Sequence, residues 1–172
     1  MRALFALLLL LPLAACDDAA VAVAPPPPAE LTADAAGYFC QMTVLDHPGP
    51  KGQAHLQGHA APLWFPQVRD LVAFVKSGER SADVAALYVN DMAQAESWER
   101  PGPGTWIAAE DAYYVVGADI AGGMGAGEIV PFGTADAARA FAGELGGAVL
   151  RLADIPADAA LGAVTPVADG RN

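Results

Sequence analysis

The spacing of hydrophobic residues predicts a helix in the first half of the folded chain. The helix is expected to begin at Pro66, because proline is tolerated in a first turn, and to end before Gly78. Its apolar residues recur at the helical period and form one stripe: Val68, Leu71, Val72 and Val75. We expect Leu71, and Phe74 or Val75, to be buried against a sheet.

A second helix is predicted after Thr134, because a threonine side chain can cap a helix N-terminus. The pair Gly146-Gly147 is expected to end this helix. Its apolar stripe comprises Ala137, Ala138, Phe141 and Leu145. We expect Phe141 to be buried against a second sheet.

Short runs of β-branched and aromatic residues between Gly and Pro turns predict the strands. The expected extended segments are Gln53–His59, Leu63-Trp64-Phe65, Val84–Asn90, Trp106–Glu110, Ala112–Val116, Glu128–Phe132 and Ala148–Leu152. In the first of these, polar residues alternate with apolar ones and place Gln53, His55, Gln57 and His59 on one face. We expect this polar face, with its histidines, to face solvent.

The order strand, aromatic turn, helix, strand occurs twice. Pro62–Phe65 with the first helix and Val84–Val89 resembles Ile129–Phe132 with the second helix and Ala148–Leu152. We therefore predict an α+β fold made of two related ββαβ halves packed together, a diverged duplication. The folded domain is expected over residues 35–155, with halves of about 35–110 and 111–155. Residues 156–172 are interpreted as a C-terminal tail, because they show no strong structural pattern.

The N-terminus has the pattern of an export signal. Met1-Arg2 precedes an apolar run, Ala3–Leu13, that is too short to span a bilayer. The following Leu13-Ala14-Ala15-Cys16 resembles the lipobox of bacterial lipoproteins. The resemblance implies a signal peptide over residues 1–15, cleavage before Cys16 and lipid attached to Cys16; a generic signal peptide cut elsewhere is the alternative.

The likeness to lipoproteins also suggests a location. It implies a protein anchored by lipid to the periplasmic face of a bacterial membrane. Asp17 resembles the signal that keeps lipoproteins of enteric-type bacteria on the inner membrane. Residues 16–34 contain Pro25–Pro28, and polyproline is extended and semi-rigid, so we interpret this segment as a tether between the lipid and the folded body.

The charge balance and the motifs of the sequence exclude several classes of function. The chain has 9 basic and 20 acidic residues and a formal net charge of -11. This balance argues against binding to nucleic acid and against electrostatic binding to anionic lipid. The sequence has no Ser-His-Asp order, no carboxylate pair at helical spacing and no Cys-x-x-Cys motif, so an enzyme is not expected.

The candidate chemistry centres on Cys40 and Met42. A thiolate and a thioether are soft ligands that favour Cu(I), and an extended Phe39–Thr43 would place both sulfurs on one face. The segment Tyr38–Val44 is compatible with a strand or with a tight turn. Once Cys16 carries lipid, Cys40 has no disulfide partner, which favours a ligand role. Burial as ordinary core residues is the alternative interpretation of this pair.

Other possible ligands are less distinctive. Met124 lies in a glycine-rich segment, Ala121–Gly127, between the predicted halves, and the alternative to a ligand is an incidental methionine in a flexible linker. Imidazole also binds copper, but we expect His47, His55 and His59 to be exposed rather than coordinating. Met92 is interpreted as a packing or surface residue.

Taken together, the lipobox, Tyr-x-Cys-x-Met at residues 38–42 and Gly-Gly-Met-Gly-Ala followed by Pro-Phe resemble the NosL family of nitrous oxide reductase accessory lipoproteins. The likeness covers about residues 36–152. It implies two ββαβ halves similar to part of the organomercurial lyase fold, and one bound Cu(I) with Cys40, Met42 and Met124 as matching ligands.

The resemblance also implies a role and partners. The family helps to supply copper to nitrous oxide reductase during maturation, together with a membrane export machinery. The alternative function is a lipid-anchored scaffold that docks protein partners without binding metal. In that case Cys40 would be buried and inert.

Overall fold

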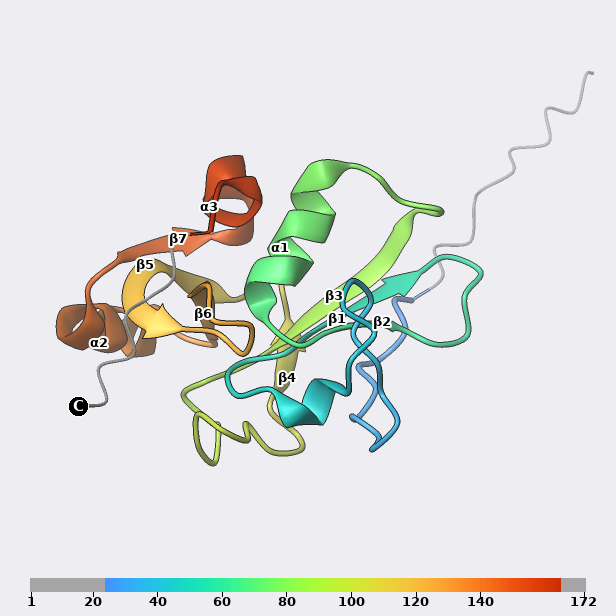
Figure 1. Cartoon of the computed structure of the whole chain (residues 1–172), viewed down its shortest axis with the longest axis horizontal. Helices are drawn as coiled ribbons and strands as arrows, with labels where there is room; N and C mark the ends of the chain where they lie inside the picture. Colours follow the sequence, from blue (N-terminus) through green and yellow to red (C-terminus); the bar gives the residue numbers. More distant parts are fainter. Residues whose placement is uncertain (1–23, 165–172) are drawn as a thin grey trace, which may run out of the picture.

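The computed structural model describes residues 24–164 and contains two antiparallel sheets with three α-helices (Figure 1). The first half comprises β1 (Gly52–Leu56), β2 (Leu63–Phe65), α1 (Val68–Ser77), β3 (Val84–Asn90) and β4 (Trp106–Ala108). The second half comprises β5 (Tyr113–Ala121), β6 (Gly127–Phe132), α2 (Ala135–Leu145) and β7 (Ala148–Arg151), followed by α3 (Ala157–Leu161). Short 3-10 turns lie at Val44–Asp46 and Leu152–Asp154.

The two sheets share one topology. Their strand orders are β2-β1-β3-β4 and β6-β5-β7, and all pairs are antiparallel. In each half the first strand is central, its hairpin partner lies on one side, and the strand after the helix lies on the other. The α+β fold of two ββαβ halves is therefore confirmed, and β4 is an extra edge strand of the first sheet.

Both predicted helices form close to their expected limits. α1 ends at Ser77, and its C-cap residue Gly78 has a φ of 69°, the left-handed conformation that glycine adopts readily. α2 begins after Thr134, whose Oγ1 accepts a hydrogen bond from the backbone N of Ala137 at 3.3 Å. Gly78 therefore marks the end of α1 and Thr134 the start of α2, as the sequence predicts.

The core joins the two halves. Phe65, Leu71 and Phe74 are buried where α1 packs on the first sheet, and this cluster also contains Tyr114 and Ile129 of the second sheet. The next residues along those strands, Val115 and Val130, point to the other face and pack with α2. The second sheet is therefore covered on both faces, which explains its nearly continuous apolar strands.

Phe141 packs against the second sheet as expected, but it is half-buried and not fully buried. Its ring lies on that of Phe132, with ring centroids 5.1 Å apart. α2 lies at one end of the molecule and covers the outer face of the second sheet (Figure 1). One side of the helix therefore faces protein and the flanks of its apolar stripe reach solvent.

The chain after β7 is more ordered than expected. Ile155 and Ala160 are buried, and α3 packs against α1. The Arg69 guanidinium of α1 donates hydrogen bonds to the carbonyl oxygens of Ala159 (2.8 Å) and Gly162 (3.1 Å). The sequence gives little warning of this helix, because α3 spans only five residues and has no side-chain cap.

The proline-rich segment is also more ordered than a free tether. Gln53 binds the backbone of Ala29 at both ends of its amide: Oε1 accepts from Ala29 N (2.8 Å) and Nε2 donates to Ala29 O (3.0 Å). The Tyr88 hydroxyl donates to Pro26 O at 2.7 Å, and Glu30 Oε1 accepts from Gly104 N at 3.1 Å. Residues 26–30, here named the strap, therefore lie across the face of the first sheet that is opposite α1. The signal peptide, Cys16 and the rest of the expected tether up to residue 23 lie outside the described residues.

The strap explains why one prediction about histidine fails. Gln53 and His55 are buried rather than solvent-facing, and His55 Nε2 lies 2.8 Å from Gln53 Oε1. Burial lowers the pKa of His55. His59 lies beyond the end of β1 and is exposed, as expected.

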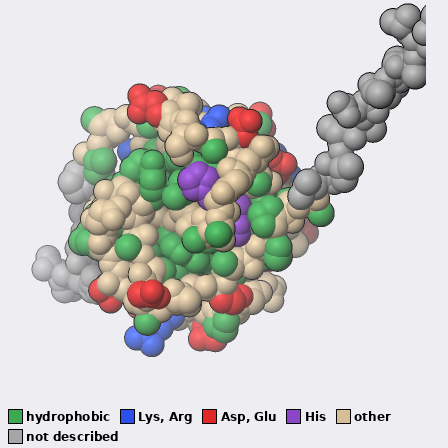
Figure 2. Space-filling model, turned by 90° about the vertical axis from the view of Figure 1, so that its right-hand side faces the viewer, with side chains coloured by type: hydrophobic (Ala, Val, Ile, Leu, Met, Phe, Trp, Pro, Cys, Tyr) green, Lys and Arg blue, Asp and Glu red, His purple; other side chains and the backbone are tan. Residues whose placement is uncertain are grey.

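The side of the molecule that lies on the right in Figure 1 is apolar in its middle. Figure 2 faces this side and shows hydrophobic side chains gathered there, with histidine side chains among them and acidic side chains toward the rim. Within residues 24–164, no helix has both the length and the apolar character needed to cross a bilayer.

Candidate metal centre

Cys40 and Met42 lie in a tight turn, not in a strand. Gly37 N donates to Met42 O and Gln41 N donates to Gly37 O, each at 2.8 Å, and Gln41 has a left-handed φ of 58°. The prediction that Phe39–Thr43 is extended and places both sulfurs on one face is therefore wrong. The tight turn, the alternative for this segment, is the conformation that forms. The two sulfur-bearing residues belong to one closed loop, here named the Cys-Met turn (residues 37–42).

The Cys-Met turn is fixed to the first sheet. Tyr38 N donates to Trp64 O of β2 at 2.7 Å, and the Tyr38 ring packs edge-on against Phe65 and Phe74. Cys40 is a free, half-buried cysteine, and Met42 is 43% exposed. The backbone of the turn is thus anchored, while Met42 reaches the surface and Cys40 is only partly buried.

Met124 lies in the hairpin loop between β5 and β6, here named the Met124 hairpin (residues 122–126). Gly122 N donates to Ala126 O at 2.7 Å, and Gly125 N donates to Gly122 O at 2.9 Å. The predicted position between the halves is therefore wrong: the glycine-rich segment connects two paired strands inside the second half. The Met124 side chain is 41% exposed.

Two glycines let this hairpin approach its neighbours closely. A Cβ at Gly122 would lie 2.5 Å from Glu128 Oε2 and 2.9 Å from Gln67 Oε1. A Cβ at Gly123 would lie 2.6 Å from His47 Cβ. These positions require glycine because any side chain would collide with the segments on either side. The hairpin is therefore wedged against the rest of the fold and is not a free linker.

Hydrogen bonds fix the hairpin in that position. Met124 N donates to Gln67 Oε1 at 3.3 Å, and Gln67 Nε2 donates to Asp70 Oδ1 at 2.8 Å. His47 Nδ1 lies 3.0 Å from Gly123 O. A carbonyl oxygen only accepts hydrogen bonds, so this contact requires the proton on Nδ1.

The start of α1 is where the two sulfur-bearing loops meet. A Cβ at Gly37 would lie 2.6 Å from Cys40 Sγ and 3.0 Å from Pro66 Cδ, so the thiol and the proline ring flank the same glycine. The next residue, Gln67, binds the Met124 backbone. The fold thus brings the Cys-Met turn and the Met124 hairpin, which are far apart in sequence, to adjacent residues at one end of α1.

Lys51 stabilises the loop that carries His47. Its buried ammonium donates to three successive carbonyl oxygens, those of His47 (2.6 Å), Pro48 (3.2 Å) and Gly49 (2.6 Å). Burial lowers the pKa of Lys51 to about 8, although the nearby Glu128 favours the charged form. The ammonium thereby holds the loop that carries His47 against the Met124 hairpin.

Glu128 joins the two halves at this point. Its Oε1 accepts from Arg69 N in the first turn of α1 (3.0 Å) and from Ile129 N (2.9 Å). The residue is 1% exposed, and its Oε2 has no hydrogen-bond partner in the described structure. Burial is the main cause that raises the pKa of Glu128 to about 8. A carboxyl group from β6 therefore takes the place of a side-chain cap for α1.

Sequence reasoning missed the supporting residues Gln67, Lys51 and Glu128 and placed His47 in solvent. The available signals were weak: a glutamine instead of a capping residue after Pro66, and a carboxylate in an otherwise apolar strand. Met92 is half-buried against the second core cluster, which agrees with its interpretation as a packing or surface residue.

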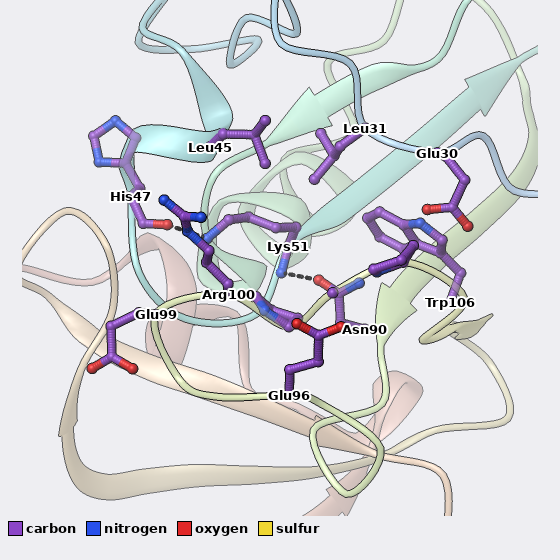
Figure 3. Close-up of a pocket in the computed structure, with 13 residues that line it drawn as sticks. Glu30, Leu31, Leu45, His47, Lys51, Asn90, Glu96, Glu99, Arg100 and Trp106 are labelled. Atoms are coloured by element: carbon purple, nitrogen blue, oxygen red, sulfur yellow. Dashed lines mark hydrogen bonds between the residues drawn. The ribbon is translucent and has the colours of Figure 1, made fainter.

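A separate pocket of about 250 Å³ lies beside the strap (Figure 3). Figure 3 shows Leu31, Leu45 and Trp106 around it, with Lys51 and Asn90 hydrogen-bonded at its base. Cys40, Met42 and Met124 do not line this pocket. It is therefore distinct from the surface that carries the three sulfurs.

The available donors decide which metal chemistry fits. Among the described residues, no group of three or more His, Cys, Asp or Glu side chains is arranged to hold a metal ion. The Cys-Met turn and the Met124 hairpin offer one thiol and two thioethers. A thiolate with thioethers suits Cu(I) and does not suit Mg²⁺ or Ca²⁺, which take oxygen ligands.

Comparisons with known proteins agree on one family. Residues 28–160 match the family model described as NosL. The chain is 50% identical over 142 residues to the copper-binding lipoprotein NosL of Achromobacter cycloclastes, covering 82% of this chain and 72% of that protein. It is 39% identical over 118 residues to the copper-binding lipoprotein NosL of Stutzerimonas stutzeri, covering 69% of this chain and 60% of that protein.

Solved structures show the same relationship. The crystal structure of the copper chaperone NosL from Shewanella denitrificans superposes with a TM-score of 0.68 at 31% identity, over 76% of this chain and 97% of that one. The solution structure of apo-NosL from Achromobacter cycloclastes gives a TM-score of 0.50 at 50% identity, over 70% and 94%. The relatives bear the names of copper-binding proteins and not of enzymes, in agreement with the expectation from the motifs. The match over residues 28–160 and the identities to these relatives establish that this chain belongs to the NosL family.

Proposed function

We propose that this chain binds one Cu(I) ion through Cys40 and Met42, with Met124 as the third ligand. The observation that carries the proposal is the convergence of the Cys-Met turn and the Met124 hairpin at Pro66 and Gln67. Cys40 is free and half-buried, and Met42 and Met124 are each more than two-fifths exposed. Copper binding by relatives at up to 50% identity supports the same conclusion.

A site with only three sulfur ligands suits a protein that transfers its metal to an acceptor protein. An acceptor protein can add a ligand to an incompletely coordinated Cu(I) before the first ligands leave, so the ion need not be released into solution. Cys40 binds copper as the thiolate, so copper binding releases the thiol proton. The exposed position of Met42 and Met124 leaves room for such an approach.

The proposal extends to a biological role. The copper is supplied to nitrous oxide reductase during its maturation, and the protein acts together with the export machinery for that enzyme. Lipid on Cys16 holds the body at the periplasmic face of the membrane, and Asp17 favours the inner membrane. The acidic net charge of -11 supports partners other than nucleic acid.

A second candidate function is a lipid-anchored scaffold that docks protein partners without metal. Tyr38 and Phe39 favour it, because they flank Cys40 and are 40% and 54% exposed. Exposed aromatic side chains of this kind often contact partner proteins. A scaffold would keep its partner binding in Cys40→Ser, whereas a copper donor would lose its cargo.

The test is competition for Cu(I) against a chelator under anaerobic conditions. Cys40→Ser should abolish tight binding, because it removes the thiolate. Met42→Leu and Met124→Leu should each weaken binding while keeping side-chain volume. Met92→Leu is the matched control, since Met92 packs in the second core cluster away from the site, and its affinity should equal that of the wild type. Wild-type affinity in Cys40→Ser would overturn the copper assignment.

A further inference from the structure

We infer that Gln67 is a positioning residue that holds Met124 at the copper site. This inference rests on the proposed function, in which Met124 is the third ligand. Gln67 would not touch the metal. It would act by fixing the backbone of Met124 against the start of α1, next to the Cys-Met turn.

The placement of Gln67 frees its side chain for this task. Gln67 is the N-cap residue of α1 and is 4% exposed, yet its side chain makes no capping hydrogen bond. The carboxyl group of Glu128 binds Arg69 N in the first turn instead. The longer glutamine side chain therefore binds Asp70 in the first turn of α1 with its nitrogen and reaches the Met124 hairpin with its oxygen.

Both ends of the Gln67 amide have a defined partner. The backbone N–H of Met124 can only donate, so it requires the oxygen Oε1, at 3.3 Å. Asp70 Oδ1 accepts from Nε2 at 2.8 Å and keeps the amide in this orientation. Asp70 therefore fixes the amide group that binds Met124 N, and a substitution that removes the amide would remove the contact with Met124.

Met124 depends on this contact because its neighbours are glycines. Gly123 precedes it and Gly125 follows it, and Gly125 has a left-handed φ of 80°. Glycines allow many backbone conformations. The position of the Met124 thioether therefore depends on the contacts that fix the hairpin backbone. His47 holds the carbonyl of Gly123, whereas Gln67 holds the backbone of Met124 itself.

The same hydrogen bond also connects the two ligand loops. Pro66 flanks Gly37 together with the Cys40 thiol, and Gln67 is the next residue. Pro66 thus contacts the Cys-Met turn, and Gln67 contacts the Met124 hairpin. Losing the amide of Gln67 should uncouple Met124 from the site without disturbing the Cys-Met turn.

The experiment is a double-mutant cycle on the full-length protein, with Cu(I) affinity measured by chelator competition. Gln67→Leu should weaken Cu(I) binding roughly three- to tenfold in the wild-type background, the range that corresponds to the net contribution of one hydrogen bond. In the Met124→Leu background it should cause no further loss. Gln94→Leu is the matched control, because Gln94 is exposed and makes only a backbone hydrogen bond to Asp91, and it should change nothing.

A structural role alone would give a different pattern. If Gln67 only stabilised the fold, Gln67→Leu would lower affinity equally with and without Met124, and that result would overturn the inference. Gln67→Asn provides a second variant if the leucine variant does not fold, because it withdraws the amide oxygen by one methylene but keeps the residue polar.

A spectroscopic readout follows Met124 directly. With methyl-labelled methionine, Cu(I) should shift the Met124 methyl resonance in the wild-type protein, and this shift should be reduced in Gln67→Leu and Gln67→Asn. Full shifts in both variants would refute positioning. Wild-type affinity in Met124→Leu would also overturn the inference while leaving copper on Cys40. Failure of the proposed function would show separately, as wild-type affinity in Cys40→Ser.

Discussion

The buried carboxyl group of Glu128 should make the stability of this protein depend on pH. Burial raises its pKa from 4.5 to about 8 in the folded state, whereas the unfolded chain has the ordinary value. Between these values the folded state binds more protons than the unfolded state, so the free energy of unfolding falls as pH rises. This contribution is fully present below the unfolded pKa and is lost as the pH rises through about 8.

The magnitude follows from the two pKa values. Each pKa unit corresponds to about 1.4 kcal/mol, and nearly the full slope applies between about pH 5 and pH 7. Glu128 should therefore reduce the free energy of unfolding by about 2–3 kcal/mol over that interval. Glu128→Gln is the neutral isostere of the protonated carboxyl: it keeps an oxygen that can accept from Arg69 and Ile129 but does not titrate.

The assay is urea unfolding at pH 5 and pH 7 for the wild type, Glu128→Gln and Glu144→Gln. Glu144 is exposed on α2, so its variant should follow the wild type. Comparing variants removes contributions from groups that do not interact with Glu128; Asp70 and Lys51 do interact with it, so the difference includes their coupling to Glu128. The wild type should lose about 2–3 kcal/mol more than Glu128→Gln between the two pH values. Equal losses in both proteins would refute the buried, protonated carboxyl.

Three further predictions address packing, the strap and the anchor. Phe74→Ala should cost about 3–5 kcal/mol because Phe74 is buried, whereas half-buried Phe141→Ala should cost about 1–2 kcal/mol; equal losses in chemical unfolding would contradict the two environments. Tyr88→Phe removes the hydrogen bond to Pro26 and should cost about 0.5–1.5 kcal/mol, with faster amide exchange at Ala29; unchanged exchange would argue against a docked strap. Cys16→Ser should leave the protein unprocessed or release it from membranes in a fractionation experiment, and unchanged processing and sedimentation would rule out lipid on Cys16.

The helices and the duplicated topology could be predicted because their signals are local. Thr134 and Gly78 act within one turn of the chain, and apolar spacing selects the buried face of each helix. The repeated order of strands around a helix then identifies the two halves. Recognition of the NosL family came from residues that lie close together, such as Cys40 and Met42.

The failures come from contacts between distant segments. The alternation of Gln53 and His55 predicts a solvated face, and only the strap over that face explains its burial. The turn at Gln41 depends on a left-handed backbone conformation at a residue that is not glycine, so the sequence does not indicate it. The support of Met124 by Gln67 joins residues 57 positions apart, so no local pattern reveals it.

X-ray absorption at the copper K-edge of the protein loaded with one Cu(I) tests the three-sulfur site most directly. The spectrum should show an edge typical of Cu(I) and a nearest shell of sulfur, with one fewer sulfur in Met124→Leu and no comparable sulfur shell in Cys40→Ser. A nearest shell made only of nitrogen and oxygen in the wild type would contradict a site built on Cys40, Met42 and Met124.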